Sequence, residues 1–176
     1  MDAVDLVGQL GDQPELRGLC AALAAAGLVR REPRLVRASI RMLAAHEAAT
    51  ALKKLIKGRV DRKRPRNART VEQSRPRPGG RTDSAHSSFP SGHSAGAMAV
   101  AQAFAREFPE YRLAARSGAA AIAAAQVPRC AHYPTDVGAG ILMGLFAEAG
   151  TALLWRLATS KAGFRPARPL PPPPPV

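Results

Sequence analysis

Long alanine-rich stretches limit most strongly what this chain of 176 residues can fold into. One of them covers residues 114–125, and apolar and polar residues do not alternate along it as they would in a half-buried strand. Alanine has the highest helix propensity of the amino acids. Aromatic residues, which favour strands, make up only 5% of the chain. The sequence therefore predicts an all-α protein and argues against a sheet-based core.

Prolines and the spacing of apolar residues divide the chain into about five expected helices. Pro65 ends the second helix, because proline cannot continue a helix. His46, within that helix, is expected to face solvent. Residues 67–89 are rich in Arg, Pro, Gly and Ser and are expected to form a long loop. The expected helices run from Pro14 to about Val29, from Leu35 to Lys63, from Ser91 past Phe104, from Tyr111 to about Val127 and from Thr135 to about Leu157.

Positive charge is concentrated in one segment. The chain has 26 Lys and Arg against 13 Asp and Glu, a net charge of +13. Between Arg30 and Arg81 there are 17 basic and 4 acidic residues, and the rest of the chain has 9 of each. This segment is expected to bind anions, and a nucleic acid, an anionic membrane or a phosphorylated ligand would each fit the charge alone. The two cysteines, Cys20 and Cys130, make neither a disulfide framework nor a four-ligand zinc site.

The last expected helix is apolar enough to cross a membrane or to lie at its surface. Residues 137–155 are 19 residues interrupted by a single charge, Glu148, and this length just crosses a bilayer. The mean hydropathy of the whole chain, −0.14, is low for an integral protein. We expect a cell-membrane protein, integral or peripheral, with a soluble form left open. The acids Asp2 and Asp5 argue against a cleavable signal peptide at the start of the chain.

The first motif with chemical content is Lys57, six further residues, and then Arg64-Pro65. A separation of seven is close to two helical turns, so a continuous helix would present both cations on one face. Two fixed cations at a helix end are suited to a doubly charged phosphate. A solvated basic face explains the same residues, so this motif alone does not decide the function.

The second motif is Phe89-Pro90-Ser91-Gly92-His93. Ser91 is a natural N-cap for the helix that follows, and Gly92 lets a ligand approach the backbone. The free N–H groups of a helix start attract an anion, and His93 would lie beside that anion in the first turn. An ordinary capped helix with a surface histidine is the alternative.

The third motif is His132-Tyr133-Pro134-Thr135-Asp136. Pro134 and Thr135 are typical of a helix entry, so His132 precedes the helix and Asp136 lies in its first turn. Asp136 is expected to accept a hydrogen bond from one ring nitrogen of His132, which fixes the tautomer and leaves the other nitrogen as a nucleophile. A His and an Asp four residues apart also occur together by chance.

In this order, the three motifs resemble the superfamily of type 2 phosphatidic acid phosphatases (PAP2) and vanadium haloperoxidases. The resemblance covers about residues 35–157, with 24 residues between Pro65 and Pro90 and 38 between His93 and His132. It implies an all-helical bundle with the active site at one end. It also implies that His93 protonates the leaving oxygen and that His132, oriented by Asp136, forms a phosphohistidine. The phosphate-binding residues that it implies are Lys57, Arg64, Ser91 and Gly92.

The chain departs from the family pattern just before the third motif. The pattern has Ser-Arg, with the Arg six residues before the nucleophilic histidine, where this chain has Ala125 and Gln126. A phosphate-binding cation is therefore missing at this position. Arg129 follows about one helical turn later and is the candidate to supply the guanidinium.

The predicted function is metal-independent hydrolysis of a lipid phosphate or diphosphate, of the phosphatidate or polyprenyl type, through a phosphohistidine. No metal, other cofactor or nucleic-acid partner is expected; the expected partner is a phosphorylated lipid or a small phosphate ester. The alternatives are a soluble broad-specificity acid phosphatase, a vanadate-dependent peroxidase, and a pseudo-phosphatase or anionic-surface binding protein weakened by Gln126. The expected domains are an N-terminal helix and linker (1–34), a PAP2-like phosphatase domain (35–160) and a Pro-rich disordered tail (161–176).

Overall fold

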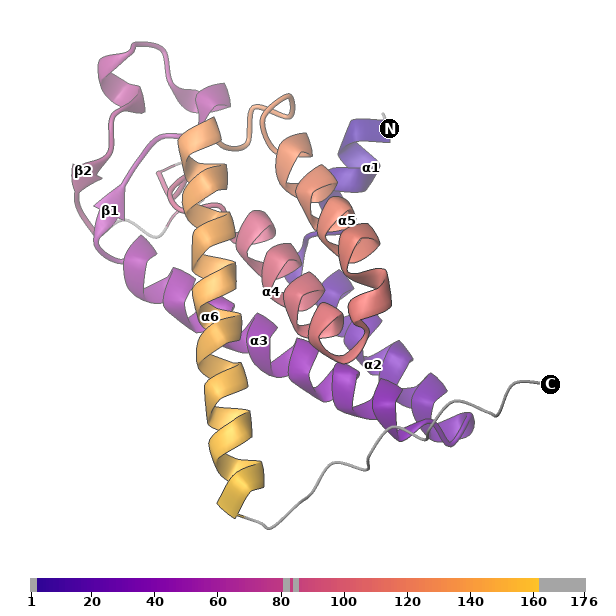
Figure 1. Ribbon diagram of the computed structural model, residues 1–176. Helices are drawn as coiled ribbons and strands as arrows, with labels where there is room; N and C mark the ends of the chain where they lie inside the picture. The colour runs from indigo at the N-terminus through magenta and orange to yellow at the C-terminus, as the bar shows by residue number, and fades with distance from the viewer. Residues whose placement is uncertain (1–2, 81–82, 84–85, 162–176) are drawn as a thin grey trace.

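Six α-helices account for most of the chain that the structure, a computed structural model, describes: residues 3–80, 83 and 86–161 (Figure 1). This confirms the predicted all-α class. The helices are α1 (Ala3–Gln9), α2 (Gln13–Val29), α3 (Pro33–Lys57), α4 (Gly92–Glu107), α5 (Arg112–Ala125) and α6 (Pro134–Lys161). The short elements are β1 (Val60–Asp61), β2 (Arg77–Pro78) and the 3₁₀ turns η1 (Pro65–Asn67), η2 (Glu72–Ser74) and η3 (Pro109–Tyr111). Apart from residue 161, the expected Pro-rich tail lies outside the described residues.

Helix α4 is the centre of the bundle and packs against α3, α5 and α6. Small side chains make this possible, because alanine lets neighbouring helix backbones approach closely. Ala95, Ala99 and Ala103, four residues apart, belong to the core shared with α2, α3 and α6. Ala97 and Ala101 face α5 in a second cluster. The alanine-rich sequence thus builds a core in which the central helix has neighbours on several sides.

Helix α6 meets the start of α4 at Gly140. A Cβ atom built on Gly140 would lie 2.4 Å from the carbonyl oxygen of Ser91, so only glycine permits this approach. The amide of Ser91 in turn donates a hydrogen bond of 3.0 Å to the carbonyl oxygen of Asp136. The packing of α6 on α4 therefore places the second and third sequence motifs side by side.

The predicted second helix is too long at its C-terminal end. Helix α3 ends at Lys57 with Gly58 as its C-cap, six residues before the expected Lys63. The chain then extends, and β1 pairs antiparallel with β2, Val60 lying opposite Pro78. Lys57 and Arg64 are therefore not on one face of a continuous helix: Lys57 ends α3, and Arg64 lies in the loop before η1. Helix α3 ends early because the residues after it pair with β2, a strand that is distant in the sequence.

Two further features differ from expectation. Helix α1 was not predicted; it is only seven residues long and packs against α5. His46 was expected to face solvent, but its side chain is 1% exposed. It lies against Gly96 of α4, where a Cβ atom would come within 3.1 Å of the imidazole. The central position of α4 covers the face of α3 that carries this histidine.

Helix α6 is long and apolar enough to cross a membrane, and it is the one such helix in the part of the chain that the structure describes. The stretch Pro134–Ser160 has a mean hydropathy of 1.7, and 33% of that window is buried in the bundle. Large apolar side chains are exposed along the rest of its surface, including Leu142, Phe146, Leu153, Leu154 and Leu157.

Candidate active site

The second motif forms the N-terminus of α4, as predicted. Ser91 is the N-cap, and its hydroxyl oxygen accepts a hydrogen bond of 3.4 Å from the amide of Ser94. The side chain of Ser91 is buried and also lies 2.8 Å from the Ser94 hydroxyl. At Gly92, the next residue, a Cβ atom would come 2.7 Å from the Cδ atom of Lys53. Glycine at this position therefore makes room for the lysine beside the start of α4.

In the third motif, the nearest hydrogen-bond partner of the His132 ring is not the residue that the sequence indicated. Its Nδ1 atom lies 2.7 Å from the carbonyl oxygen of Ser88 and 3.9 Å from Oδ2 of Asp136. The nearest acceptor of Nδ1 is therefore Ser88, while the expected partner Asp136 lies at ion-pair distance and raises the pKa of His132. Because a carbonyl oxygen can only accept, Nδ1 carries the proton and Nε2 keeps its lone pair in the neutral ring. Burial lowers the pKa of His132 and so favours this neutral form.

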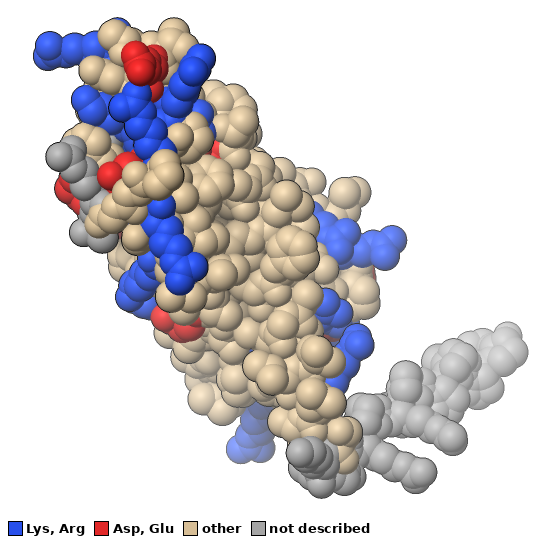
Figure 2. Space-filling model, turned by 90° about the vertical axis from the view of Figure 1, so that its left-hand side faces the viewer, with Lys and Arg blue, Asp and Glu red and all other residues tan. Residues whose placement is uncertain are grey.

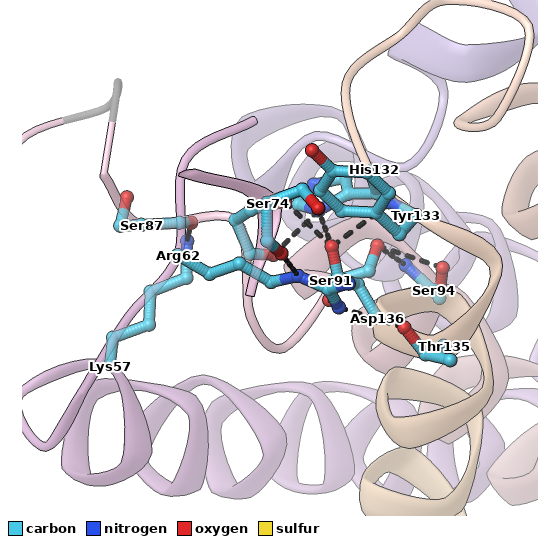
Figure 3. Close-up of polar contacts among 11 residues, drawn as sticks. Lys57, Arg62, Ser74, Ser87, Ser91, Ser94, His132, Tyr133, Thr135 and Asp136 are labelled. Atoms are coloured by element: carbon cyan, nitrogen blue, oxygen red, sulfur yellow. Dashed lines mark hydrogen bonds and ion pairs between the residues drawn. The ribbon is translucent and has the colours of Figure 1, made fainter. Parts of the chain in front are cut away.

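Asp136 organises the loops around His132 (Figure 3). Its carboxylate accepts hydrogen bonds from the hydroxyl of Ser88 at 2.6 Å and from the amide of Tyr133 at 3.0 Å. Its other oxygen lies 2.5 Å from Nη1 of Arg62. Asp136 thus fixes Ser88, the residue whose carbonyl holds His132, and its carboxylate also raises the pKa of His132 directly.

A polar cavity of about 350 Å³ lies where the two motifs meet. His93 and His132 both line it, and the centroids of their rings are 6.1 Å apart. The other lining residues are Gly11, Asp12, Gln13, Pro14, Lys53, Lys57, Arg64 and Gly92. Three cations and two histidines therefore share one cavity, although helix geometry does not align Lys57 with Arg64 as the sequence indicated.

The charges at this cavity are strongly positive and partly buried. Burial lowers the pKa of Lys57 to about 8, and the positive charges of Arg64 and Lys53 act in the same direction. The ammonium of Lys57 donates to the carbonyl oxygen of Ser87 at 2.8 Å (Figure 3). The Nε atom of Arg64 is buried and has no acceptor among the described residues. Buried donors of this kind are suited to an anionic ligand.

The surface around this end of the molecule is basic. Figure 2 shows Lys and Arg gathered at the end that carries the loop between α3 and α4, next to a broad face with few charges. Among the described residues, His, Cys, Asp and Glu do not come together in groups of three or more that could hold a metal ion.

Arg129 and Gln126 lie beneath α1 and not among the residues that line the cavity. The Nε atom of Arg129 lies 3.1 Å from the Asp5 carboxylate. The fully buried amide of Gln126 donates to the carbonyl oxygens of Gly8 at 3.2 Å and Ile122 at 3.1 Å. Arg129 is therefore outside the cavity lining, but its positive charge reaches the site, where it lowers the pKa of His93.

Four residues of the site escaped the sequence analysis: Asp12, Lys53, Arg62 and Ser88. Lys53 could have been predicted from the sequence, since it lies four residues before Lys57 and shares its helix face. Arg62 and Arg64 are two apart in a segment that is extended, so reading it as a strand would have placed both on one side. Ser88 holds His132 through a backbone carbonyl, which no residue type reveals.

The chain belongs to the PAP2 superfamily, whose sequence model matches residues 38–160. This confirms the resemblance inferred from the three motifs. The chain is also similar to the Lipid A 1-phosphatase of Rhizobium johnstonii, with 43% identity over 72 residues, which are 41% of this chain and 30% of the relative. The Lipid A 1-phosphatase of Rhizobium etli is 42% identical over 71 residues, 40% of this chain and 31% of the relative. The aligned part thus spans under a third of either relative's length. No solved structure matches the chain.

Proposed function

We propose that the protein is a phosphatase that hydrolyses a phosphate monoester or diphosphate through a phosphohistidine at His132. The observation that carries this proposal is the shared cavity, which brings Lys57, Arg64, His93 and His132 together. These are a nucleophile, an acid and two cations, the groups that phosphoryl transfer requires. Membership of the PAP2 superfamily and the printed names of both relatives support the same class of reaction.

In the first step, Nε2 of His132 attacks phosphorus, and the bond from phosphorus to the leaving oxygen breaks as the N–P bond forms. Lys57 and Arg64 stabilise the negative charge on the equatorial oxygens, and a phosphoryl oxygen would satisfy the buried Nε of Arg64. His93 donates a proton to the leaving oxygen. In the second step, water attacks the phosphohistidine, neutral His93 accepts a proton, and inorganic phosphate is released.

We further propose that the reaction needs no added metal ion. Positive charge at the transferring group comes from Lys53, Lys57 and Arg64, which line the cavity. In metal-dependent phosphatases, bound cations supply the equivalent charge stabilisation. Addition of a chelator is therefore expected to leave the rate unchanged.

The proposed substrate is a phosphorylated lipid that the protein meets at a membrane surface. Both named relatives are lipid A phosphatases. In this chain, the exposed leucines and Phe146 of α6 form an apolar surface of the kind that inserts into the edge of a bilayer. Lipid A, a diacylglycerol phosphate and a polyprenyl diphosphate are the lipids to compare.

The test is release of phosphate from these three lipids and from p-nitrophenyl phosphate, with and without EDTA. His132→Ala is the inactive variant, and His86→Ala, which changes a histidine outside the cavity, is its matched control. We expect turnover in the wild type and His86→Ala, and neither turnover nor an acid-labile phosphoenzyme in His132→Ala. A phosphoenzyme that persists in His132→Ala would exclude the nucleophile. Activity lost in EDTA and restored by zinc or magnesium would exclude the metal-independent reaction.

A further inference from the structure

His93 has a carboxylate partner that comes from outside the family domain. Oδ1 of Asp12, in the turn between α1 and α2, contacts Nε2 of His93, and the two residues are 81 positions apart in the sequence. The match to the PAP2 superfamily begins only at residue 38. The contact is thus a property of the N-terminal segment of this chain.

The turn that carries Asp12 is fixed by the helices on either side. The amide of Asp12 donates to the carbonyl oxygen of Gln9 at 2.8 Å, and its own carbonyl oxygen accepts from the amide of Leu16 at 3.1 Å. Leu16 is buried in the main core, and α1 packs on α5. The carboxylate is therefore held on two anchored helices, which is what a precise contact requires.

Asp12 is the one carboxylate among the described residues that line the cavity. The other charged or titratable groups there are Lys53, Lys57, Arg64 and His132. Burial lowers the pKa of His93, and His132 and Arg129 act in the same direction. The Asp12 carboxylate opposes them and raises the pKa of His93. Without Asp12, burial and the charges of His132 and Arg129 would all favour the neutral form, which is a far weaker acid than the protonated ring.

We propose that Asp12 is the positioning residue of the acid His93. Its carboxylate holds the Nε2–H group, so that the protonated ring presents Nδ1–H to the leaving oxygen. As the bond from phosphorus to oxygen breaks, the Nδ1 proton passes to that oxygen, and the ring becomes neutral with Nε2–H still bound to Asp12. The inference rests on the proposed function and assigns a catalytic part to the segment before the family domain.

The first test is the rate of Asp12→Asn, which keeps the shape of the side chain and removes its charge. For an alkyl phosphate at pH 7.5 we expect kcat to fall about 10- to 100-fold, because such a leaving group needs a proton. For p-nitrophenyl phosphate, whose leaving group is good, we expect a change of less than about threefold. Asp12→Glu should recover part of the loss. Glu15→Gln, an equal change of charge on an exposed residue three positions away, is the control and should behave as the wild type.

The second test does not depend on activity. NMR titration of the histidine rings in the full chain should show the His93 pKa lower in Asp12→Asn by about one to three units, the usual effect of losing a carboxylate in contact. An unchanged His93 pKa overturns the inference, whether or not the chain is active. So does a rate increase for all substrates in Asp12→Asn, which would mean that Asp12 merely competes with phosphate for the cations. An inactive wild type with the expected NMR shift would contradict the proposed function and support the Asp12–His93 pairing.

Discussion

Arg62 and Asp136 form an ion pair that joins the loop after α3 to the first turn of α6, with Nη1 of Arg62 2.5 Å from Oδ1 of Asp136. The same guanidinium donates to the hydroxyl of Thr135 at 2.7 Å and to the carbonyl oxygen of Ser74 at 2.7 Å. It also lies over the ring of Tyr133, 4.0 Å from the centroid. One largely buried side chain thus binds three acceptors and one aromatic face, and it ties Ser74 to the residues that follow His132.

We predict that Arg62→Lys lowers kcat about tenfold or more, because an ammonium replaces neither the fork of donors nor the stacking on Tyr133. The substrate KM should change less, since Arg62 does not line the cavity. Arg59→Lys, an exposed arginine three residues earlier, is the control and should keep full activity. Steady-state kinetics on p-nitrophenyl phosphate measure both constants. Equal activity of the two variants would show that the Arg62 contacts do not position His132.

The second prediction concerns pH. Burial lowers the pKa of Lys57 to about 8, so its positive charge is present below this pH and is lost as the pH rises through it. The inhibition constant of inorganic phosphate should therefore rise above pH 8, by about tenfold per pH unit at most if a single proton is involved. Lys57→Arg keeps its charge over this range and should flatten the profile. A rise of the same size in Lys57→Arg would assign the titration to another group.

The parts of this fold that the sequence could predict are those decided by neighbouring residues. Ser91 caps α4 as expected, because capping involves residues within one turn. The predicted end of the second helix, at Lys63, is wrong. The helix stops before Gly58 because the strand that follows pairs with Arg77–Pro78, nearly twenty residues away. His46 was misassigned for a similar reason: only the packing of α4 decides that it is buried.

The site shows the same division. The residue types and order of the three motifs indicate which side chains meet at one cavity, since each motif has a chemical reason for its composition. The hydrogen-bond partners of those side chains could not be predicted from the sequence. Ser88 holds His132 through a carbonyl oxygen, and Asp12 reaches His93 across 81 positions. Neither contact has a local pattern, so both required the three-dimensional structure.

The third prediction concerns the apolar surface of α6. Phe146 is 72% exposed and Leu153 is 56% exposed, on a helix that otherwise packs against the bundle. Replacing both with Ser should move the protein from the membrane fraction to the soluble fraction and leave hydrolysis of p-nitrophenyl phosphate intact. Leu113→Ser, which changes a leucine that is 77% exposed on α5, is the control and should leave the distribution unchanged. A protein that stays in the membrane fraction after the double change would contradict attachment through this surface.

The fourth prediction concerns Arg129, the candidate to replace the cation missing at Gln126. Arg129 pairs with Asp5 and is not among the residues that line the cavity. Its positive charge nevertheless lowers the pKa of His93, so its field reaches the site. We expect Arg129→Ala to reduce kcat/KM about three- to tenfold, well short of the 100-fold or greater loss typical of removing a direct oxyanion donor and expected for Arg64→Ala. Arg129→Lys should be close to the wild type, because at this range the charge matters more than the guanidinium geometry. Arg112→Ala on the exposed start of α5 is the control.

Combining Arg129→Ala with Gln126→Arg tests whether Arg129 partly replaces the cation missing at Gln126 or has only a structural role. Gln126 is fully buried against Gly8, so a guanidinium at this position stays in the same region beneath α1. Gln126→Arg alone should change kcat/KM by less than about threefold, and in the Arg129→Ala background it should restore most of the lost rate, because residues that share one role are coupled. Thermal unfolding of all three variants checks that the bundle is intact. Strictly additive effects on kcat/KM would show that Arg129 does not take over the missing cation's role.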